Sequence, residues 1–181
     1  DIVRIGCGSL GIGYAILRLQ NVYGEGQSLN NPYTGILSIF STRIRRGLNL
    51  PIFEDGKESR DFIHVEDVAR AMLKCLSTDK SPDNVFNVGS GIASSVIDVA
   101  TQLSLGLDAK PNLEVTGQYR IGDIRHNRAD TNRLVNDLGY QPKITLEQGM
   151  KRFADWVKQQ PLPEDKLAKT FDELKARNLM G

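Results

Sequence analysis

Short apolar runs along the chain alternate with longer segments in which apolar residues recur every three or four positions. The run Tyr14–Leu19 predicts a buried strand, because its apolar residues follow one another almost without interruption. The segment after it is rich in Asn, Gly and Pro and predicts a loop over residues 21–35. Further strand-like runs are Leu50–Phe53, Arg60–Val65, Asn84–Gly91 and Leu113–Val115.

The segments with helical spacing have recognisable ends. Ser95 with Asp98 fits an N-cap, and Thr145 with Gln148 matches a capping box. Gly47 follows three arginines and ends the first of these helices. The expected helices lie at about residues 36–46, 66–76, 96–103, 130–138, 146–157 and 167–174.

Alternating strands and helices predict an α/β fold. The strands are few and unevenly spaced, and no internal repeat is present. The pattern therefore indicates part of a doubly wound sheet joined to a second lobe.

Composition sets the class of protein. The chain has 181 residues, of which 40% are hydrophobic and 25% charged, as in a soluble globular domain. A net charge of +1 gives no argument for binding nucleic acid or an anionic membrane. No apolar run is long enough to span a bilayer, and no signal peptide is visible. Two cysteines, Cys7 and Cys75, suggest neither a disulfide framework nor a metal site, so we expect a reducing, cytoplasmic setting.

The stretch GCGSLG at residues 6–11 satisfies the glycine pattern of dinucleotide-binding turns. Such a turn must follow a strand and open a helix. Here only Ile12 and Gly13 separate Gly11 from the next apolar run, so no helix fits after it. We therefore interpret residues 1–11 as the end of a helix, with closely packed small residues and Gly11 near its C-cap.

Four blocks occur in order along the chain: LRLQNVYGEGQ, IFEDGKESRDFIHVEDVARA, VFNVGSG and YRIGDIRHNRADTNRLVNDLGYQP. Together they resemble the carboxyl-terminal half of the extended short-chain dehydrogenase/reductase family, the NAD-dependent nucleotide-sugar epimerases and dehydratases. Within this family, the sequence looks most similar to the bacterial sugar 4-epimerases of the dTDP-L-rhamnose and UDP-glucose types. The resemblance implies the last strands of a Rossmann-like doubly wound sheet and a small mixed α/β substrate-binding lobe over residues 1–160. Residues 161–181 would form a helical tail.

The resemblance also implies roles for individual residues. Arg60 and Arg120 match arginines that contact the pyrophosphate, and Arg suits oxyanions because its guanidinium is a planar fork. Asp123 matches the acid that binds the nucleotide ribose, and Asn21 matches an amide that binds the sugar nucleotide. Each has a plainer alternative: salt bridges from the arginines to Asp61 or Asp123, and a loop cap for Asn21.

The resemblance implies binding roles for several apolar residues as well. By resemblance, Pro51, Ile52 and Phe53 hold the base, and the backbone of Ile36 contacts the nucleotide. Leu19 and Val22 match positions near the nicotinamide of NAD. Phe53, Leu19 and Val22 could equally be core residues. His64 and His126 are expected to be structural, and we predict no metal site.

Two features of the family's chemistry are missing from these residues. No Tyr-x-x-x-Lys pair occurs, although the family uses one to take the hydroxyl proton as hydride passes to NAD. The glycine-rich NAD turn is also absent, so the amino-terminal NAD-binding half is expected to lie upstream. We therefore expect a catalytically inactive fragment that binds a UDP- or dTDP-linked sugar, from a full-length protein that is a homodimer.

Three functions stay open. The leading one is part of an NAD-dependent 4-epimerase, and the nearest alternative is a nucleotide-sugar 4,6-dehydratase or decarboxylase on the same scaffold. The third is a non-catalytic module that binds a nucleotide or a protein.

Overall fold

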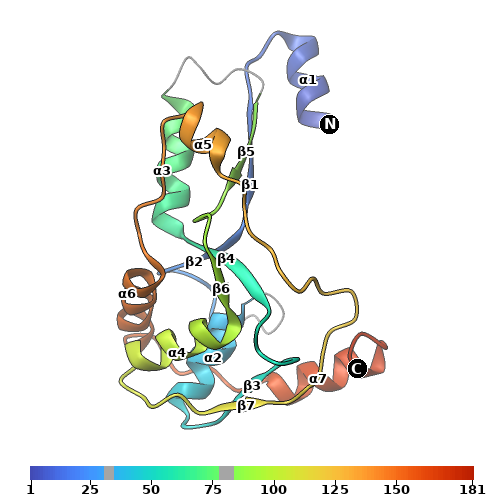
Figure 1. Ribbon diagram of the computed structural model, residues 1–181, viewed down its shortest axis with the longest axis vertical. Helices are drawn as coiled ribbons and strands as arrows, with labels where there is room; N and C mark the ends of the chain where they lie inside the picture. The colour runs from blue at the N-terminus through green and yellow to red at the C-terminus, as the bar shows by residue number, and fades with distance from the viewer. Residues whose placement is uncertain (31–34, 78–83) are drawn as a thin grey trace.

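Helices and strands alternate along most of the chain, and the strands of its described residues form three small sheets (Figure 1). The computed structural model describes residues 1–30, 35–77 and 84–181. The predicted α/β class is confirmed, whereas the part of the expected loop at residues 31–34 lies outside the described residues. The molecule is elongated, with α1 (Ile2–Leu10) at one end and α7 (Leu167–Ala176) at the other.

The end that carries α1 is built on a two-stranded parallel sheet. β1 (Ala15–Leu19) pairs with β5 (Asn84–Val88), and α3 (Val65–Leu76) and α5 (Asn132–Asn136) lie beside it (Figure 1). The prediction of a buried strand at Tyr14–Leu19 is wrong in one respect. Residues 15–17 are half-buried and Arg18 and Leu19 are exposed, because β1 pairs only with β5 within the described residues.

A three-stranded sheet occupies the middle of the molecule. β4 (Ser59–His64) pairs in parallel with β2 (Asn21–Tyr23) and antiparallel with β6 (Ala93–Ser95). Asn21–Tyr23 was expected to be loop, and this prediction is wrong. The strand forms because its partner, about 40 residues further along the chain, supplies the backbone hydrogen bonds that the local sequence does not signal.

The end that carries α7 contains the larger core. There α2 (Ile36–Arg45) and α4 (Val96–Gly106) lie near the parallel pair of β3 (Leu50–Ile52) and β7 (Leu113–Val115), and α6 (Leu146–Lys158) packs against α4 (Figure 1). Leu37, Phe40, Ile52, Phe153 and Val157 are among its buried residues.

Strand β4 joins the two cores. Phe62 packs in the larger core, and its neighbour Ile63 packs in the smaller one with Phe86 and Val88. Successive side chains of a strand point to opposite faces, so one strand serves both clusters. The same alternation sends Arg60 and Asp61 to different surroundings.

Helix ends follow the local sequence closely. Ser95–Asp98 and Thr145–Gln148 both form complete capping boxes, as their spacing predicted. Gly11 ends α1 in the left-handed conformation, with φ of 63°, which confirms the helix-end interpretation of GCGSLG. Close packing of its small residues was expected and is wrong: a Cβ at Gly6 or Gly8 would meet nothing within 4 Å, because α1 buries no residue.

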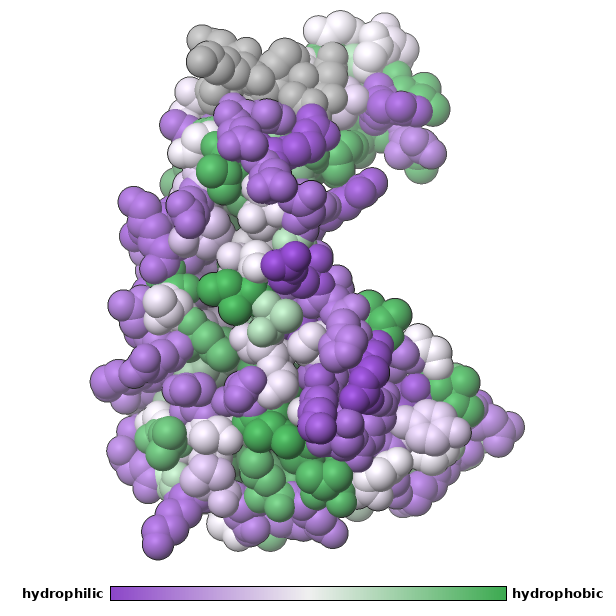
Figure 2. All heavy atoms as spheres, in the orientation of Figure 1, coloured by the Kyte–Doolittle hydropathy of each residue, from purple (hydrophilic) through white to green (hydrophobic). Residues whose placement is uncertain are grey.

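The space-filling view shows the molecule hollowed on one side, between the end that carries α1 and the end that carries α7 (Figure 2). Among the described residues, every helix is too short or too polar to cross a bilayer. The boundary expected near residue 160 stays a prediction; beyond it, Phe171 of α7 contacts Phe53 just after β3.

Candidate functional site

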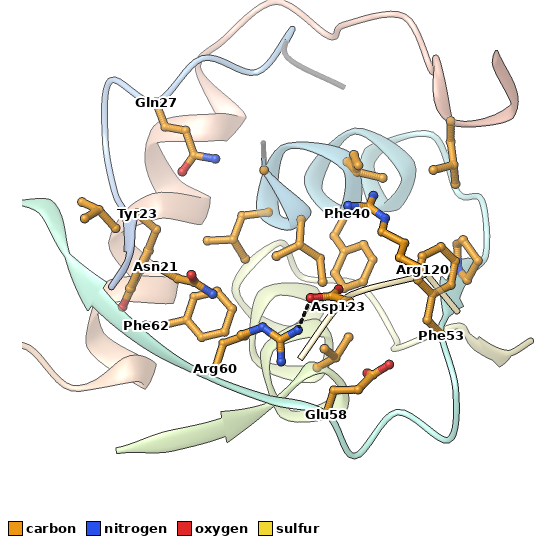
Figure 3. Close-up of a pocket in the computed structure, with 18 of the residues that line it drawn as sticks. Asn21, Tyr23, Gln27, Phe40, Phe53, Glu58, Arg60, Phe62, Arg120 and Asp123 are labelled. Carbon is orange, nitrogen blue, oxygen red and sulfur yellow. Dashed lines mark hydrogen bonds and ion pairs between the residues drawn. The ribbon is translucent and has the colours of Figure 1, made fainter. Parts of the chain in front are cut away.

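The main cavity of the described structure lies where β2, β4, α2, β3 and α7 meet, and encloses about 500 Å³. Pockets for small ligands typically enclose about 300–1,000 Å³. Eight of the ten predicted binding residues line it: Asn21, Val22, Ile36, Pro51, Phe53, Arg60, Arg120 and Asp123. They come from segments far apart in the sequence and face one space (Figure 3).

Two predicted residues do not line this cavity. Ile52 is fully buried in the core, and its carbonyl accepts hydrogen bonds from the N–H and hydroxyl of Thr116. Leu19 lies at the exposed end of β1. Ile52 alternates with Pro51 and Phe53 along one short segment, so it faces the core while they face the cavity.

Arg60 is held in place before any ligand binds. Its Nη2 donates to Asp123 Oδ1 at 2.8 Å, drawn as a dashed line in Figure 3. Its Nη1 donates to the carbonyls of Ser59 at 3.0 Å and Arg125 at 3.1 Å. The salt bridge to Asp123 considered from the sequence is therefore present, and it orients the guanidinium at the cavity wall.

Asp61, the other candidate partner of Arg60, has a separate structural role. It is fully buried and accepts hydrogen bonds from the N–H and hydroxyl of Ser90, both at 2.7 Å. It also accepts from the N–H groups of Gly91 and Ala129. These bonds fasten the loop after β5 and the approach to α5 onto β4, beneath the cavity.

Arg120 is the cation left without a carboxylate partner in the described part of the cavity. Its guanidinium carbon lies 5.8 Å from the centre of the Phe53 ring, in a cation–π contact (Figure 3). Its Nε is buried and has no hydrogen-bond acceptor among the described residues. As a cavity-lining cation without a carboxylate partner among the described residues, the Arg120 guanidinium favours an anionic oxygen in the cavity.

Glu58 places a carboxyl in the same cavity, and its charged form would repel an anion there. It lines the cavity and is only 7% exposed. Burial, followed by the charge of Glu54, raises the pKa of its carboxyl above the ordinary value, although Arg60 and Arg125 act in the other direction. Glu58 was not singled out from the sequence, because nothing in KES indicates that a lysine-flanked acid turns inward.

Amide groups provide the neutral polar part of the lining. Gln27 Nε2 donates to Ser38 Oγ at 2.9 Å, while its Oε1 is buried without a partner in the described structure. Gln20 Oε1 accepts from Asn127 Nδ2 at 3.0 Å. Together with Asn21, these groups can hydrogen-bond sugar hydroxyls. Both glutamines stand in the motif-like block LRLQNVYGEGQ, which was the available signal for them.

His64 lies behind the cavity and is structural. Its Nδ1 accepts from the N–H of Glu66 and caps α3, so the proton of the neutral ring is on Nε2, 3.0 Å from Glu25 Oε2. Burial lowers the pKa of His64, and the nearby Glu25 carboxylate offsets part of that effect. Arg152 pairs with Glu25 and Glu66 and ties α6 to this group.

The fit of NAD to these residues is partial. Val22 offers an apolar, exposed side chain on the cavity rim, and Leu19 another at the end of β1. A phosphate cradle at GCGSLG does not exist, because these residues form the last turns of α1 and do not link a strand to a helix. The described residues therefore cannot hold the NAD phosphates in the usual way.

Residues 2–89 match the NAD dependent epimerase/dehydratase family. Over these residues the chain belongs to this family. The resemblance seen in the sequence is thereby confirmed, and NAD is the cofactor by which the family is named.

Relatives within the NAD-dependent epimerase/dehydratase family include sugar 4-epimerases. A dTDP-L-rhamnose 4-epimerase of Burkholderia thailandensis is 40% identical over 81% of this chain and 40% of its own length. A UDP-glucose 4-epimerase of Mycolicibacterium smegmatis is 30% identical over 76% of this chain and 43% of its own length. The crystal structure of Thermotoga maritima UDP-glucose 4-epimerase with UDP-glucose matches with a TM-score of 0.73 and 33% identity, over 87% of this chain and 50% of that one.

The chain spans half or less of the length of these family members. What it contains is a cavity with cations, amides and aromatic rings. It contains no Tyr-x-x-x-Lys sequence. The arrangement can bind and orient a ligand that has an anionic and a planar apolar part.

Proposed function

We propose that this chain is the sugar-nucleotide-binding part of an NAD-dependent 4-epimerase that acts on a UDP- or dTDP-linked hexose. The observation that carries the proposal is Arg120, a cavity-lining cation that stacks on Phe53 and has no carboxylate partner in the described structure. A pyrophosphate beside a nucleoside supplies the missing counter-charge and a planar partner together.

Each group has a distinct part in binding. Arg120 and the pre-oriented Arg60 hold the pyrophosphate, and Asp123, already paired with Arg60, offers its carboxylate to a ribose hydroxyl. Asn21, Gln20 and Gln27 bind hydroxyls of the sugar. Pro51 and Phe53 contact the base, and Leu19 and Val22 approach the nicotinamide when NAD is bound. Bound NAD would accept a hydride from C4 of the sugar and return it.

This chain's contribution is binding energy. The nucleotide is a non-reacting handle whose contacts position the hexose. The acid–base groups of the reaction are not among these residues, so we expect no epimerase turnover with this chain as the only protein. A homodimer and a cytoplasmic location for the whole protein belong to the same proposal.

A titration by calorimetry with UDP-glucose and dTDP-glucose tests the proposal. We expect one of them to bind, and Arg120→Ala to weaken its affinity by about tenfold or more, because a hydrogen bond to a charged group contributes about 1.5–3 kcal/mol. Arg4→Ala is the matched control, since Arg4 lies on exposed α1, outside the cavity lining, and pairs with Asp1. The proposal is wrong if neither sugar nucleotide binds, or if Arg120→Ala binds as well as the unchanged chain.

The same titrations separate the alternatives. A 4,6-dehydratase or decarboxylase predicts equal binding but a different product once the whole protein is assayed with substrate. A non-catalytic module predicts no turnover by the whole protein. NAD alone is expected not to bind this chain measurably, because its phosphate site is absent from the described residues.

A further inference from the structure

The segment after α6 returns to the cavity along α2. Three arginines at the end of α2 fasten it: Arg43 pairs with Asp165 at 2.6 Å, and Arg45 and Arg46 donate to the carbonyls of Gln160 and Pro163 at 2.8 and 2.7 Å. These contacts bridge more than 110 positions of sequence. They place the start of α7 against α2.

The end of the chain is fastened on the other side of the cavity. The N–H of Tyr119 donates to the carbonyl of Gly181 at 2.9 Å, and the N–H of Gly181 donates back at 3.0 Å. The N–H of Ile121 donates to the carbonyl of Leu179 at 3.1 Å. Arg120 therefore stands in a backbone ladder with this last segment.

Between these two attachments, α7 presents two side chains to the cavity. Leu167 and Phe171, one helical turn apart, are part of its lining. The ring of Phe171 lies 5.6 Å from that of Phe53, tilted by 40°. Phe53 thus has Phe171 as one neighbour and the Arg120 guanidinium as another.

The cavity consequently has two chemically different regions. One holds Arg60, Asp123 and the amides, and the other holds Phe53, Phe171, Pro51 and Leu167. In a sugar nucleotide the planar apolar part is the base, and aromatic side chains bind bases by stacking. Arg120 stands at the border between the two regions.

We infer that α7 forms one wall of the base-binding region, and that Phe171 acts with Phe53 to hold the nucleobase. This inference rests on the proposed nucleotide-sugar site and adds a second aromatic residue, from a segment expected from sequence only to be a helical tail. Phe171 then contributes to binding of the nucleoside and not to binding of the pyrophosphate.

The test compares two probes, UDP and inorganic pyrophosphate, on the unchanged chain and on Phe171→Leu. Leucine retains apolar packing of α7 but removes the aromatic face. We expect UDP affinity to fall about tenfold, in line with loss of a stacked ring, while pyrophosphate affinity stays within about twofold. Phe171→Tyr keeps the aromatic face and should bind UDP nearly as well as the unchanged chain.

Asp172→Ala, on the exposed side of α7, is the control for a general effect on the helix. Equal UDP affinity in Phe171→Leu overturns the inference. Equal loss of UDP and pyrophosphate also overturns it, since the change would then act by displacing Arg120. Failure of the unchanged chain to bind UDP or any sugar nucleotide would instead contradict the proposed function itself.

Discussion

Two buried tyrosines differ in one respect: within the described structure, the hydroxyl of one has a hydrogen-bond partner and the hydroxyl of the other does not. Tyr140 donates to Asp67 Oδ1 at 2.7 Å. The hydroxyl of Tyr23 has no partner among the described residues, and it packs against Gly149, where an added Cβ would lie 2.0 Å from it. Burial raises the pKa of both phenols well above the usual value, so both are neutral at pH 7.

This contrast predicts opposite effects of the same substitution. Tyr140→Phe leaves Asp67 without one of its donors and should lower the free energy of unfolding by about 1–2 kcal/mol. Tyr23→Phe removes a buried hydroxyl that has no partner and should leave stability unchanged or raise it by up to about 1 kcal/mol. Urea unfolding of both variants measures the difference, and a greater loss in Tyr23→Phe would contradict the assignment.

Contacts between residues that are far apart in the sequence are the part of the site that the sequence predicts least well. Arg60 and Asp123, both recognised from motifs, are 63 positions apart; the sequence offered Asp61 and Asp123 as alternative partners, and the choice is decided only when β4 and the segment after β7 fold together. Neither Glu58 nor Phe171 was assigned a binding role by a sequence motif. Glu58 lines the cavity because of its position just before β4, and Phe171 lines it because of where α7 packs. Their part in the site could not be predicted from local pattern.

At the scale of elements, the ends of helices depend on neighbouring residues and could be predicted from the sequence. The pairing of strands depends on distant residues and could not. The capping boxes at Ser95 and Thr145 need only residues three positions apart. Strand β2 and the exposure of β1 depend on which strands lie beside them, and no feature of NVY or AILRL decides that. The family resemblance located the cavity residues because the spacing within its motifs keeps them on the right elements.

His64 is the N-cap of helix α3, and this cap makes the stability of the folded chain depend on pH. The lowered pKa of His64 means that the unfolded chain binds a proton more readily than the folded one. Stability contributed by the neutral ring is complete above about pH 6.5 and declines as the pH falls through the lower, folded-state pKa. The carboxylates around it, Glu25 and Glu66, have lowered pKa values and lose their charge only at more acidic pH.

We therefore expect the free energy of unfolding to fall between about pH 8 and about pH 5, and to fall less in His64→Asn. Asparagine is a good N-cap and keeps an acceptor at the start of α3. His126→Asn, a change in a polar segment, is the control and should retain the dependence of the unchanged chain. Equal pH profiles for all three proteins would refute the role of His64.

At the scale of the whole molecule, the end that carries α1 contrasts with the rest. Helix α1 buries no residue, and Ile2 and Leu10 are 90% and 72% exposed. Strand β1, which follows it, has one strand partner in the described structure. Apolar surface and an open strand edge together favour association.

The chain should consequently associate as its concentration rises, and sedimentation velocity measures this directly. Leu10→Lys places a charge on α1 and should shift the distribution toward monomer. Leu105→Lys, at an exposed position of α4, is the control and should not. A chain that stays monomeric at every concentration would show that this end does not promote self-association.

Strand β4 connects the cavity to both cores, so a bound ligand should affect the stability of the whole molecule. Phe62 and Ile63 bind it into both cores, and Arg60, two residues earlier, faces the cavity. Local opening of either core disturbs the other through this strand, so the two ends should unfold as one cooperative unit. A nucleotide that occupies the cavity stabilises the folded state by mass action. Amide hydrogens of β5, remote from the cavity, should then exchange more slowly when the nucleotide is present.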